Sequence, residues 1–350
     1  MRNKFRFIWI MLPVSLLAAA LITSGRRVTR DSNPQLGSLA SMVKPVKSAE
    51  LPSREASANF KIAFIGDQGP GGRARAVLNL IKNEQAHAVM HSGDFDYEDN
   101  PAAWDAQISN ILGSDFPYFA SVGNHDDESF YISGGYQDLM KARMNRLGIT
   151  WDGDLGVKSS IVYKGMFFVL TAPGVLGSGH AEYIRDKLAE DNSIWSISSW
   201  HKNMRRMQVG GKSNDTGWEV YEESRKGRAI IATAHEHSYS RTHLLSSCQN
   251  QTVASTSDTL ALSADDPATP QDEGKTFVFV SGLGGRSIRD QELGGNWWAS
   301  IYTSTQDANH GALFGIFNYE GKEGFAKFYF KDIDGVVPDA FYVNVIKSRN

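Results

Sequence analysis

The sequence contains almost no cysteine and no strong excess of charge. Cys248 is the only cysteine among 350 residues, so an intrachain disulfide is excluded. The formal net charge at pH 7 is -3, which gives no reason to expect a nucleic acid or an anionic membrane surface as a partner. The sequence also lacks evident internal repeats, and its length suffices for one large domain with a substantial core.

The N-terminus carries an uninterrupted apolar run. Residues 2–6 contain three basic side chains, the run extends from Phe7 to Thr23, and three alanines stand at 18–20. This pattern is typical of a secretory signal, so residues 1–25 predict a secreted or extracytoplasmic protein. Because a run of about seventeen residues is near the lower limit for spanning a bilayer, membrane anchoring through residues 7–23 is the alternative.

The rest of the chain divides into a linker and one folded domain. Residues 26–58 contain Ser, Pro and Lys without a clear period and are interpreted as a flexible linker. The domain, residues 59–350, opens with a strand, a glycine-rich loop, a helical pattern and a second strand, which indicates an α/β fold. Residues 246–275 are polar and predict a long surface insertion. Strand-like runs between 277 and 345 predict a second sheet packed on the first.

Polar side chains of metal-binding types stand where strand-like runs end. The candidate ligands are Asp67, Asp94, Tyr97, Asn124, His201, His235 and His237. Such oxygen and nitrogen ligands suit di- or trivalent first-row metals, and seven are too many for one ion. Two ions that share the Asp94 carboxylate are the economical arrangement. If the last strand continued through His235-x-His237, both imidazoles would point the same way, and each could serve a different ion.

The first loop also matches a competing motif. Residues 69–74 fit the G-x-G-x-x-A dinucleotide fingerprint between a strand and a helix. In that interpretation Asp94 would bind the ribose. An anionic Asp67 beside a pyrophosphate is electrostatically unfavourable, and the motif leaves Tyr97, Asn124 and the histidine pair without a role.

The order of the motifs resembles that of the calcineurin-like metallophosphoesterases and, within them, the purple acid phosphatases. Residues 66–69, 93–97 and 123–126 are similar to the GDxG, GDxxY and GNHD motifs, and the likeness extends from about Lys61 to Tyr239. The broader superfamily places a histidine ligand where Gly69 stands. Here the resemblance implies that Tyr97 takes the place of that ligand. The resemblance implies an α/β fold of the metallophosphoesterase type, a β-sandwich of two mixed sheets flanked by helices.

The resemblance also implies a role for each candidate residue. A ferric ion would be held by Asp67, Tyr97 and His237, a divalent iron, zinc or manganese ion by Asn124, His201 and His235, and Asp94 would bridge them. His125 would be the phosphate-side acid and hydrogen-bond donor, and Asp126 would orient it.

Some positions depart from the family pattern. Ser198 replaces the valine of VxxH, and Ala234 replaces the glycine of GHxH. Neither position is a ligand, so the chemistry should survive, although the backbone near His235 can differ. Lys202, Arg205 and Arg206 occupy a region in which plant-type enzymes carry further histidines, which bears on leaving-group specificity.

Together these features predict an exported acid phosphatase that acts on small phosphorylated substrates. Two metal ions would activate a hydroxide for attack on phosphorus, most readily in phosphomonoesters. Two alternatives stay open at this point. One is a phosphodiesterase or nucleotide pyrophosphatase on the same site, and the other is an exported metal-binding protein without turnover. The sequence does not indicate the oligomeric state.

Overall fold

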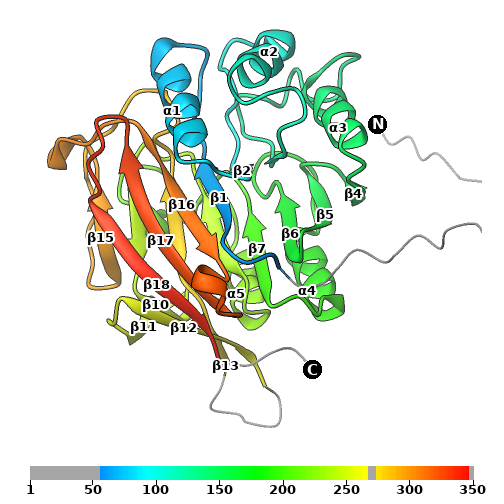
Figure 1. The fold of residues 1–350 in the computed structure, drawn as a ribbon. Coiled ribbons are helices and arrows are strands. Elements are labelled where there is room, and N and C mark those ends of the chain that lie inside the picture. The colour runs from blue at the N-terminus through cyan, green and yellow to red at the C-terminus, as the bar shows by residue number, and fades with distance from the viewer. Residues whose placement is uncertain (1–55, 267–272, 347–350) are drawn as a thin grey trace, which may run out of the picture. The chain divides into compact units, whose positions relative to one another are not determined.

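Two eight-stranded sheets form the body of the protein in the computed structural model, which describes residues 56–266 and 273–346 (Figure 1). The first sheet contains, in spatial order, β13 (Glu273–Lys275), β12 (Thr259–Asp265), β18 (Asp339–Val345), β17 (Phe325–Asp332), β16 (Gly311–Phe317), β1 (Phe60–Ile65), β2 (Ala88–His91) and β3 (Tyr118–Ala120). The second contains β15 (Trp298–Tyr302), β9 (Tyr239–Thr242), β14 (Val278–Ser281), β8 (Ile230–Thr233), β7 (Trp195–Ser199), β6 (Met166–Thr171), β5 (Lys158–Tyr163) and β4 (Asp152–Asp154).

Aromatic side chains join the inner faces of the two sheets. Phe64 of β1 contacts Phe279 of β14 edge to face, with ring centroids 5.2 Å apart, and Phe277 meets Phe328 of β17 at 5.9 Å. All four side chains are fully buried. The sandwich core is therefore apolar, and it fixes the relative position of the strand ends that carry the polar residues.

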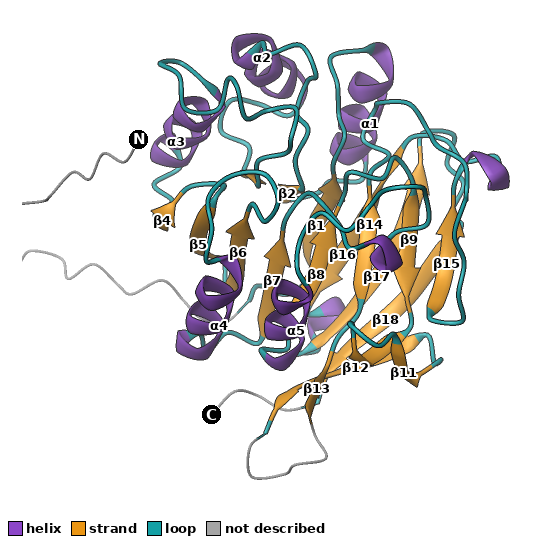
Figure 2. Cartoon of the chain, turned by 180° about the vertical axis from the view of Figure 1, so that it is seen from behind, coloured by secondary structure: helices purple, strands orange, loops and turns teal. Residues whose placement is uncertain are grey.

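Helices flank the sheets (Figure 2). The described residues contain α1 (Gly72–Asn83), α2 (Pro101–Ile111), α3 (Tyr136–Arg146), α4 (His180–Glu190) and α5 (Trp218–Lys226). The apolar period predicted for the first helix is confirmed, since Ala74, Val77, Leu78 and Ile81 are its buried residues. Helices α4 and α5 pack through a second apolar cluster on the outer face of β6, β7 and β8. The fold is thus the predicted α/β sandwich of two mixed sheets.

Strands β1, β2 and β3 are parallel to one another, and so are β6, β7, β8 and β14. Parallel strands bring their carboxyl ends to one edge of a sheet, which is where ligand sites of open α/β sheets lie. The predicted ligands follow β1, β2, β3, β7 and β8. The topology therefore collects residues that are up to 170 positions apart in the sequence, from Asp67 to His237.

Two predictions about the C-terminal half are wrong. The segment 246–275 is not simply a surface insertion, because it contains a small hairpin, β10 (Leu244–Ser247) with β11 (Thr252–Ser255), and then β12 and β13. Leu260 and Leu262 of β12 reach the core, and β12 pairs in parallel with β18. The late strands also do not form a separate sheet. β14 pairs with β8, whereas β16 pairs antiparallel with β1.

The predicted signal segment, residues 1–25, lies outside the described residues, as does most of the predicted linker. The last linker positions belong to the folded part, because Ala56 is buried and its carbonyl accepts a 2.7 Å hydrogen bond from Asn318 Nδ2. No helix within 56–266 or 273–346 is long and apolar enough to cross a membrane.

Candidate metal centre

The loops after β1 and β2 run side by side and present the first two carboxylates. The backbone amides of residues 67, 68 and 69 donate hydrogen bonds to the carbonyls of residues 93, 94 and 95, and each donor–acceptor distance is 3.0 Å. Asp67, Asp94, Tyr97 and His235 all adopt positive φ, between 56° and 68°. Such backbone geometry is unfavourable for residues other than glycine and clusters at functional sites. The surrounding hydrogen bonds hold these turns so that Asp94, Tyr97 and His235 line one cavity, with Asp67 buried behind Tyr97.

One cluster consists of Asp67, Tyr97 and His237. Tyr97 Oη donates to Asp67 Oδ1 over 2.9 Å and lies 3.1 Å from His237 Nε2. His237 Nε2 is 3.4 Å from Asp67 Oδ1, so three donor atoms lie in mutual contact. The second oxygen, Asp67 Oδ2, accepts the backbone amide of His235 over 2.9 Å. Burial and the two carboxylates raise the pKa of Tyr97 far above its usual range.

The other cluster consists of Asp94, His201 and His235. His201 Nε2 lies 3.2 Å from Asp94 Oδ1 and 3.0 Å from His235 Nδ1. Burial disfavours a charged imidazole, but the Asp94 carboxylate outweighs it and raises the pKa of His201 to about 9. Burial and the charge on His201 lower the pKa of His235 to about 2. Asp94 also lies close enough to Tyr97 to act on its pKa, so this carboxylate faces both clusters.

Outer hydrogen bonds fix the two central imidazoles. His201 Nδ1 lies 2.8 Å from the carbonyl oxygen of Ser92, which can only accept, so Nε2 is the nitrogen that is free to bind. His237 Nδ1 lies 3.1 Å from Ser287 Oγ, which leaves its Nε2 facing Tyr97. This arrangement is the usual outer support of metal-binding histidines.

The loop after β3 carries Asn124, His125 and Asp126. Asn124 Oδ1 is buried and has no hydrogen-bond partner in the described part of the chain. The backbone amide of His125 donates to Asp94 Oδ1 over 3.0 Å, and its ring lies against Tyr97 with centroids 4.7 Å apart. His125 is exposed at the cavity, as its predicted role requires.

Asp126 has a different role from the predicted one. Its carboxylate accepts the backbone amides of Asp94, Phe95 and Gly123 over 2.7–2.9 Å and is fully buried. It makes no contact with the His125 side chain among the interactions of the described residues. Asp126 therefore positions the two loops that carry Asp94 and Asn124, and it does not orient the imidazole.

Glycines in the motifs allow the loops to approach closely. A Cβ on Gly123 would lie 2.2 Å from the Asp94 amide and carboxylate, and one on Gly93 would lie 2.8 Å from His201 Nδ1. At Gly69 a Cβ would point toward the Tyr97 ring, 3.9 Å away, so the phenol occupies the side on which a residue at 69 would project. Ala234, which replaces the family glycine, is accommodated because Gly66 lies opposite its methyl group.

The histidine pair does not lie on a continuing strand, and that prediction is wrong. β8 ends at Thr233, and residues 234–238 form a tight bend with hydrogen bonds from Glu236 N to Ala234 O and from Ser238 N to Glu236 O. The bend, together with the positive φ of His235, turns His235 toward Asp94 and His237 toward Asp67. Each imidazole thus joins a different cluster, as expected, but by another geometry.

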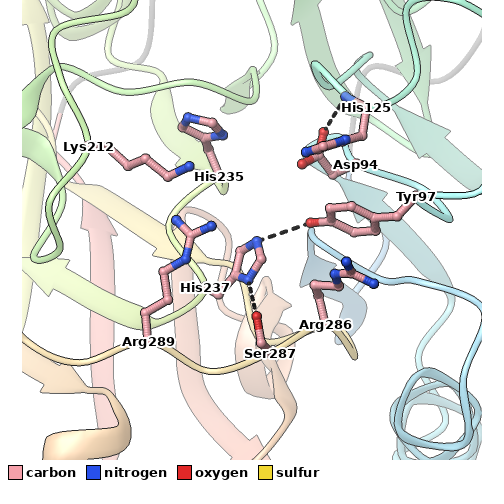
Figure 3. A pocket seen from close by; sticks show the side chains of 9 residues that line it. All are labelled: Asp94, Tyr97, His125, Lys212, His235, His237, Arg286, Ser287 and Arg289. Carbon is pink, nitrogen blue, oxygen red and sulfur yellow. Dashed lines mark hydrogen bonds between the residues drawn. The ribbon is translucent and has the colours of Figure 1, made fainter.

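A cavity of about 160 Å³ opens onto both clusters (Figure 3). Its lining includes four predicted ligands, the predicted acid His125, and Lys212, Arg286, Ser287 and Arg289. The last four were not predicted as site residues. A signal for three of them existed, because β14 ends in a glycine-rich polar loop at 282–289, the same pattern that marks the other ligand-bearing strands. Lys212 lies in a charged loop without any periodic signal.

Comparison with known proteins agrees with this geometry. The sequence profile of the calcineurin-like phosphoesterases matches residues 60–239, about half of the chain. The chain belongs to the calcineurin-like phosphoesterase family. Family membership supports metal-dependent hydrolysis of phosphoesters. No curated protein sequence matches the chain.

Solved structures share the fold of this chain at low sequence identity. A purple acid phosphatase, PPD1 from yellow lupin seeds, is 17% identical with a TM-score of 0.60, and the match covers 83% of this chain. The chain spans 55% of the length of that enzyme. GAP50 of Plasmodium, described as the anchor in the inner membrane complex, is 13% identical over 84% of this chain and 91% of its own length, with a TM-score of 0.53. The predicted likeness to purple acid phosphatases is confirmed at the level of fold.

The residues of this site fit a pair of metal ions. Two donor atoms that bind one ion at about 2.1 Å lie roughly 3.0–3.4 Å apart. The three donor pairs of the Asp67 cluster are 2.9–3.4 Å apart, and His201 lies 3.0–3.2 Å from His235 and Asp94. The unpartnered Asn124 Oδ1 supplies a further neutral oxygen donor near His125. The mixture of carboxylate, phenol, amide and imidazole suits hard and borderline cations. The dinucleotide alternative fails, because Asp67 and Asp94 are engaged with histidines and Tyr97.

Proposed function

We propose that this protein is a binuclear phosphatase that hydrolyses small phosphomonoesters, with Fe(III) at the Asp67, Tyr97 and His237 cluster. A divalent iron, zinc or manganese ion would take Asn124, His201 and His235, and Asp94 would face both ions. The observation that carries this proposal is the pair of donor clusters that share Asp94 on one cavity. The phenol of Tyr97 favours a trivalent ion in its cluster, because phenolate is a hard oxygen donor.

The chain's own groups supply the remaining functions. When bound, the two cations acidify a water molecule and offset the negative charge of the phosphoryl group. His125 is held at the cavity by the hydrogen bond from its backbone amide to Asp94 and by the Tyr97 ring. In this position its imidazole can protonate a leaving alkoxide. Asp126 keeps this loop against the Asp94 loop through three backbone amides. The side chains of this chain would thus hold the metal ions, position the two loops and protonate the leaving group.

The fold by itself does not decide between turnover and binding. GAP50, which shares the fold, is described as an anchor. In this chain both donor clusters, the exposed His125 and an open cavity are present together, and this combination favours an enzyme. An exported, extracytoplasmic location is part of the proposal and rests on the pattern of residues 1–25 alone.

Metal analysis with a visible spectrum and paired assays tests the proposal. We expect two metals per chain, a tyrosinate-to-iron band that disappears in Tyr97→Phe but not in Tyr131→Phe, and faster turnover of p-nitrophenyl phosphate than of its bis ester. Tyr131, on the loop after His125, is a suitable control because its exposed phenol donates a hydrogen bond to Asp154 of β4, away from the candidate ligands. Preference for the diester would replace the phosphatase assignment by a phosphodiesterase. A protein that holds metals but turns over neither ester would be a binding protein.

A further inference from the structure

Two cationic side chains line the cavity with little local compensation of their charge. Lys212 Nζ forms no ion pair or side-chain hydrogen bond in the described part of the chain, although the residue is half-buried. The guanidinium of Arg289 has one carboxylate neighbour, Glu236, with Nη1 and Oε2 3.4 Å apart. Burial and the charge on Arg289 lower the pKa of Lys212. Two cations thus share one carboxylate, Glu236, and together they form a wall with a surplus of positive charge at the cavity.

This wall is built from two loops that are joined by backbone hydrogen bonds. The carbonyl of Val209 accepts the amides of Glu292 and Leu293, each over 2.8 Å. The carbonyl of Lys212 itself accepts Gln208 Nε2 over 3.0 Å. Because both loops are tied together, Lys212 and Arg289 are held on one side of the cavity, and less conformational entropy is lost when an anion binds.

A buried carboxylate supports the position of Arg289. Glu236 is 1% exposed, its Oε1 has no hydrogen-bond partner among the described residues, and its Oε2 faces Arg289. Gly210 makes room for it, since a Cβ there would lie 2.3 Å from the Glu236 carboxyl carbon. A buried carboxylate next to one guanidinium holds that guanidinium at the cavity. Glu236 is thus a positioning residue for Arg289.

Lys212 and Arg289 lie on the His235 and His237 side of the cavity, away from His125, the proposed acid. In Figure 3, Lys212 lies beside His235 and Arg289 beside His237, whereas Asp94 and His125 stand across the cavity. Arg286 does not belong to the wall, because its guanidinium packs 4.4 Å from the centroid of the Tyr97 ring. An anion that meets Lys212 and Arg289 is therefore a neighbour of the phosphoryl group at the metal clusters.

We propose that Lys212 and Arg289 form a subsite for a second phosphate, so that this protein prefers substrates with a phosphate adjacent to the one that it cleaves. This inference rests on the proposed phosphatase function. In a phosphoanhydride, a water oxygen would bond to the terminal phosphorus while the bond from that phosphorus to the bridging oxygen breaks. The bridging oxygen leaves on the shorter phosphate, and the products are orthophosphate, that shorter phosphate and the proton released from water.

The experiment compares adenosine diphosphate with adenosine monophosphate, which differ by one phosphate. We expect the ratio of kcat/KM for the diphosphate to that for the monophosphate to fall at least about tenfold in Lys212→Met and in Arg289→Met. Arg206→Met is the matched control, because Arg206 is an exposed cation of the neighbouring 3-10 helix that packs on Trp297 outside the cavity. In the unaltered enzyme the diphosphate rate should also fall more steeply with ionic strength.

The outcomes separate the two proposals. If neither nucleotide nor p-nitrophenyl phosphate is hydrolysed, the proposed function is wrong. If the monoesters are hydrolysed but both nucleotide rates fall equally in the variants, the cations act on the cleaved phosphoryl group and the subsite is wrong. An unchanged ratio in both variants also overturns it. Inorganic pyrophosphate, assayed in parallel, shows whether the second phosphate suffices without the nucleoside, and the ionic-strength comparison needs no variant.

Discussion

Two buried clusters in this protein have nearly the same chemical composition but differ in their surroundings. In the first, Asp67 meets Tyr97 and His237 at the cavity. In the second, Asp339 accepts Tyr239 Oη over 2.7 Å and a bidentate Arg241 at 2.7 and 2.9 Å. Tyr239 is only two residues beyond His237. The first cluster is part of a proposed metal site, whereas in the second the carboxylate is paired entirely within the protein.

The difference lies in the counter-charge. Arg241 carries a permanent positive charge, stacks 4.1 Å from the centroid of Phe341 and neutralises Asp339 within the protein. The carboxylates of Asp67 and Asp94 face imidazoles and a phenol instead, and Asp94 also lines the open cavity. A buried carboxylate with a built-in arginine stabilises the fold, whereas a pair of carboxylates without one has its charge balanced when cations bind. The same residue types thus give structure in one place and a site in another.

Replacing Asp94 should give the largest effect on activity. Asp94→Asn removes the charge that faces both clusters, so we expect kcat/KM to fall at least about 10⁴-fold, equal to about 5 kcal/mol. The melting temperature should also decrease, because His201 loses the buried carboxylate that it pairs with. Metal content, kinetics and thermal unfolding measure this directly. Asp127→Asn, an exposed carboxylate on the same loop as His125, is the control and should behave as the unaltered protein.

Replacing Asp339 should lower stability without affecting the proposed metal site. Asp339→Ala leaves Arg241 buried without its partner, and the free energy of unfolding should fall by about 3–5 kcal/mol. Protein that stays folded should keep its metals and its KM. Urea unfolding checks the first point and metal analysis the second. If Asp339→Ala does not fold, Tyr239→Phe offers a milder variant with an expected loss of about 1 kcal/mol. Loss of metal from folded Tyr239→Phe would show that the two clusters are coupled, and the contrast drawn here would be wrong.

The sequence predicted the strand ends and the ligand types but not how the strands pair. Phe60–Ile65 and Ala88–His91 are short apolar runs, and their burial could be inferred without a structure. The position of β12 could not, because Leu260 and Leu262 are its only large apolar side chains and the surrounding segment is polar. Periodicity reports whether a residue is buried, whereas the partner strand depends on contacts between distant parts of the chain.

The same limit applies to the site. Asp67, Tyr97 and His237 follow recognisable motifs, so their convergence could be predicted. The bend at 234–238 could not, since a positive φ at His235 is rare for a residue other than glycine. Asp126 illustrates another limit. Its place beside His125 in the sequence suggested a contact with that side chain. Its carboxylate instead accepts hydrogen bonds from three backbone amides.

Replacing His125 should affect catalysis with little effect on stability, because the residue is exposed and only its backbone amide is bonded. We expect His125→Ala to lower kcat about 10²-fold with a poor leaving group such as glycerol, and less with p-nitrophenol, which needs no proton. The two leaving groups, assayed side by side with a melting curve, measure this effect. An equal loss on both substrates would indicate that His125 binds phosphate and does not donate a proton.

Cys248 provides the smallest expected effect. It tests whether the apolar cluster away from the metal site stays inaccessible to solvent and reagents. The thiol is fully buried in the apolar cluster beneath α4 and α5, and burial raises its pKa well above the ordinary value. Because only the thiolate reacts readily, the native protein should not react with a disulfide reagent within minutes, and one thiol should react after unfolding in urea. Metal removal should not change this rate, since Cys248 lies in a cluster that contains none of the proposed ligands. Fast labelling of the metal-free protein would mean that the metals also hold the α4–α5 layer in place. The apolar cluster around Cys248 would then depend on the metal site.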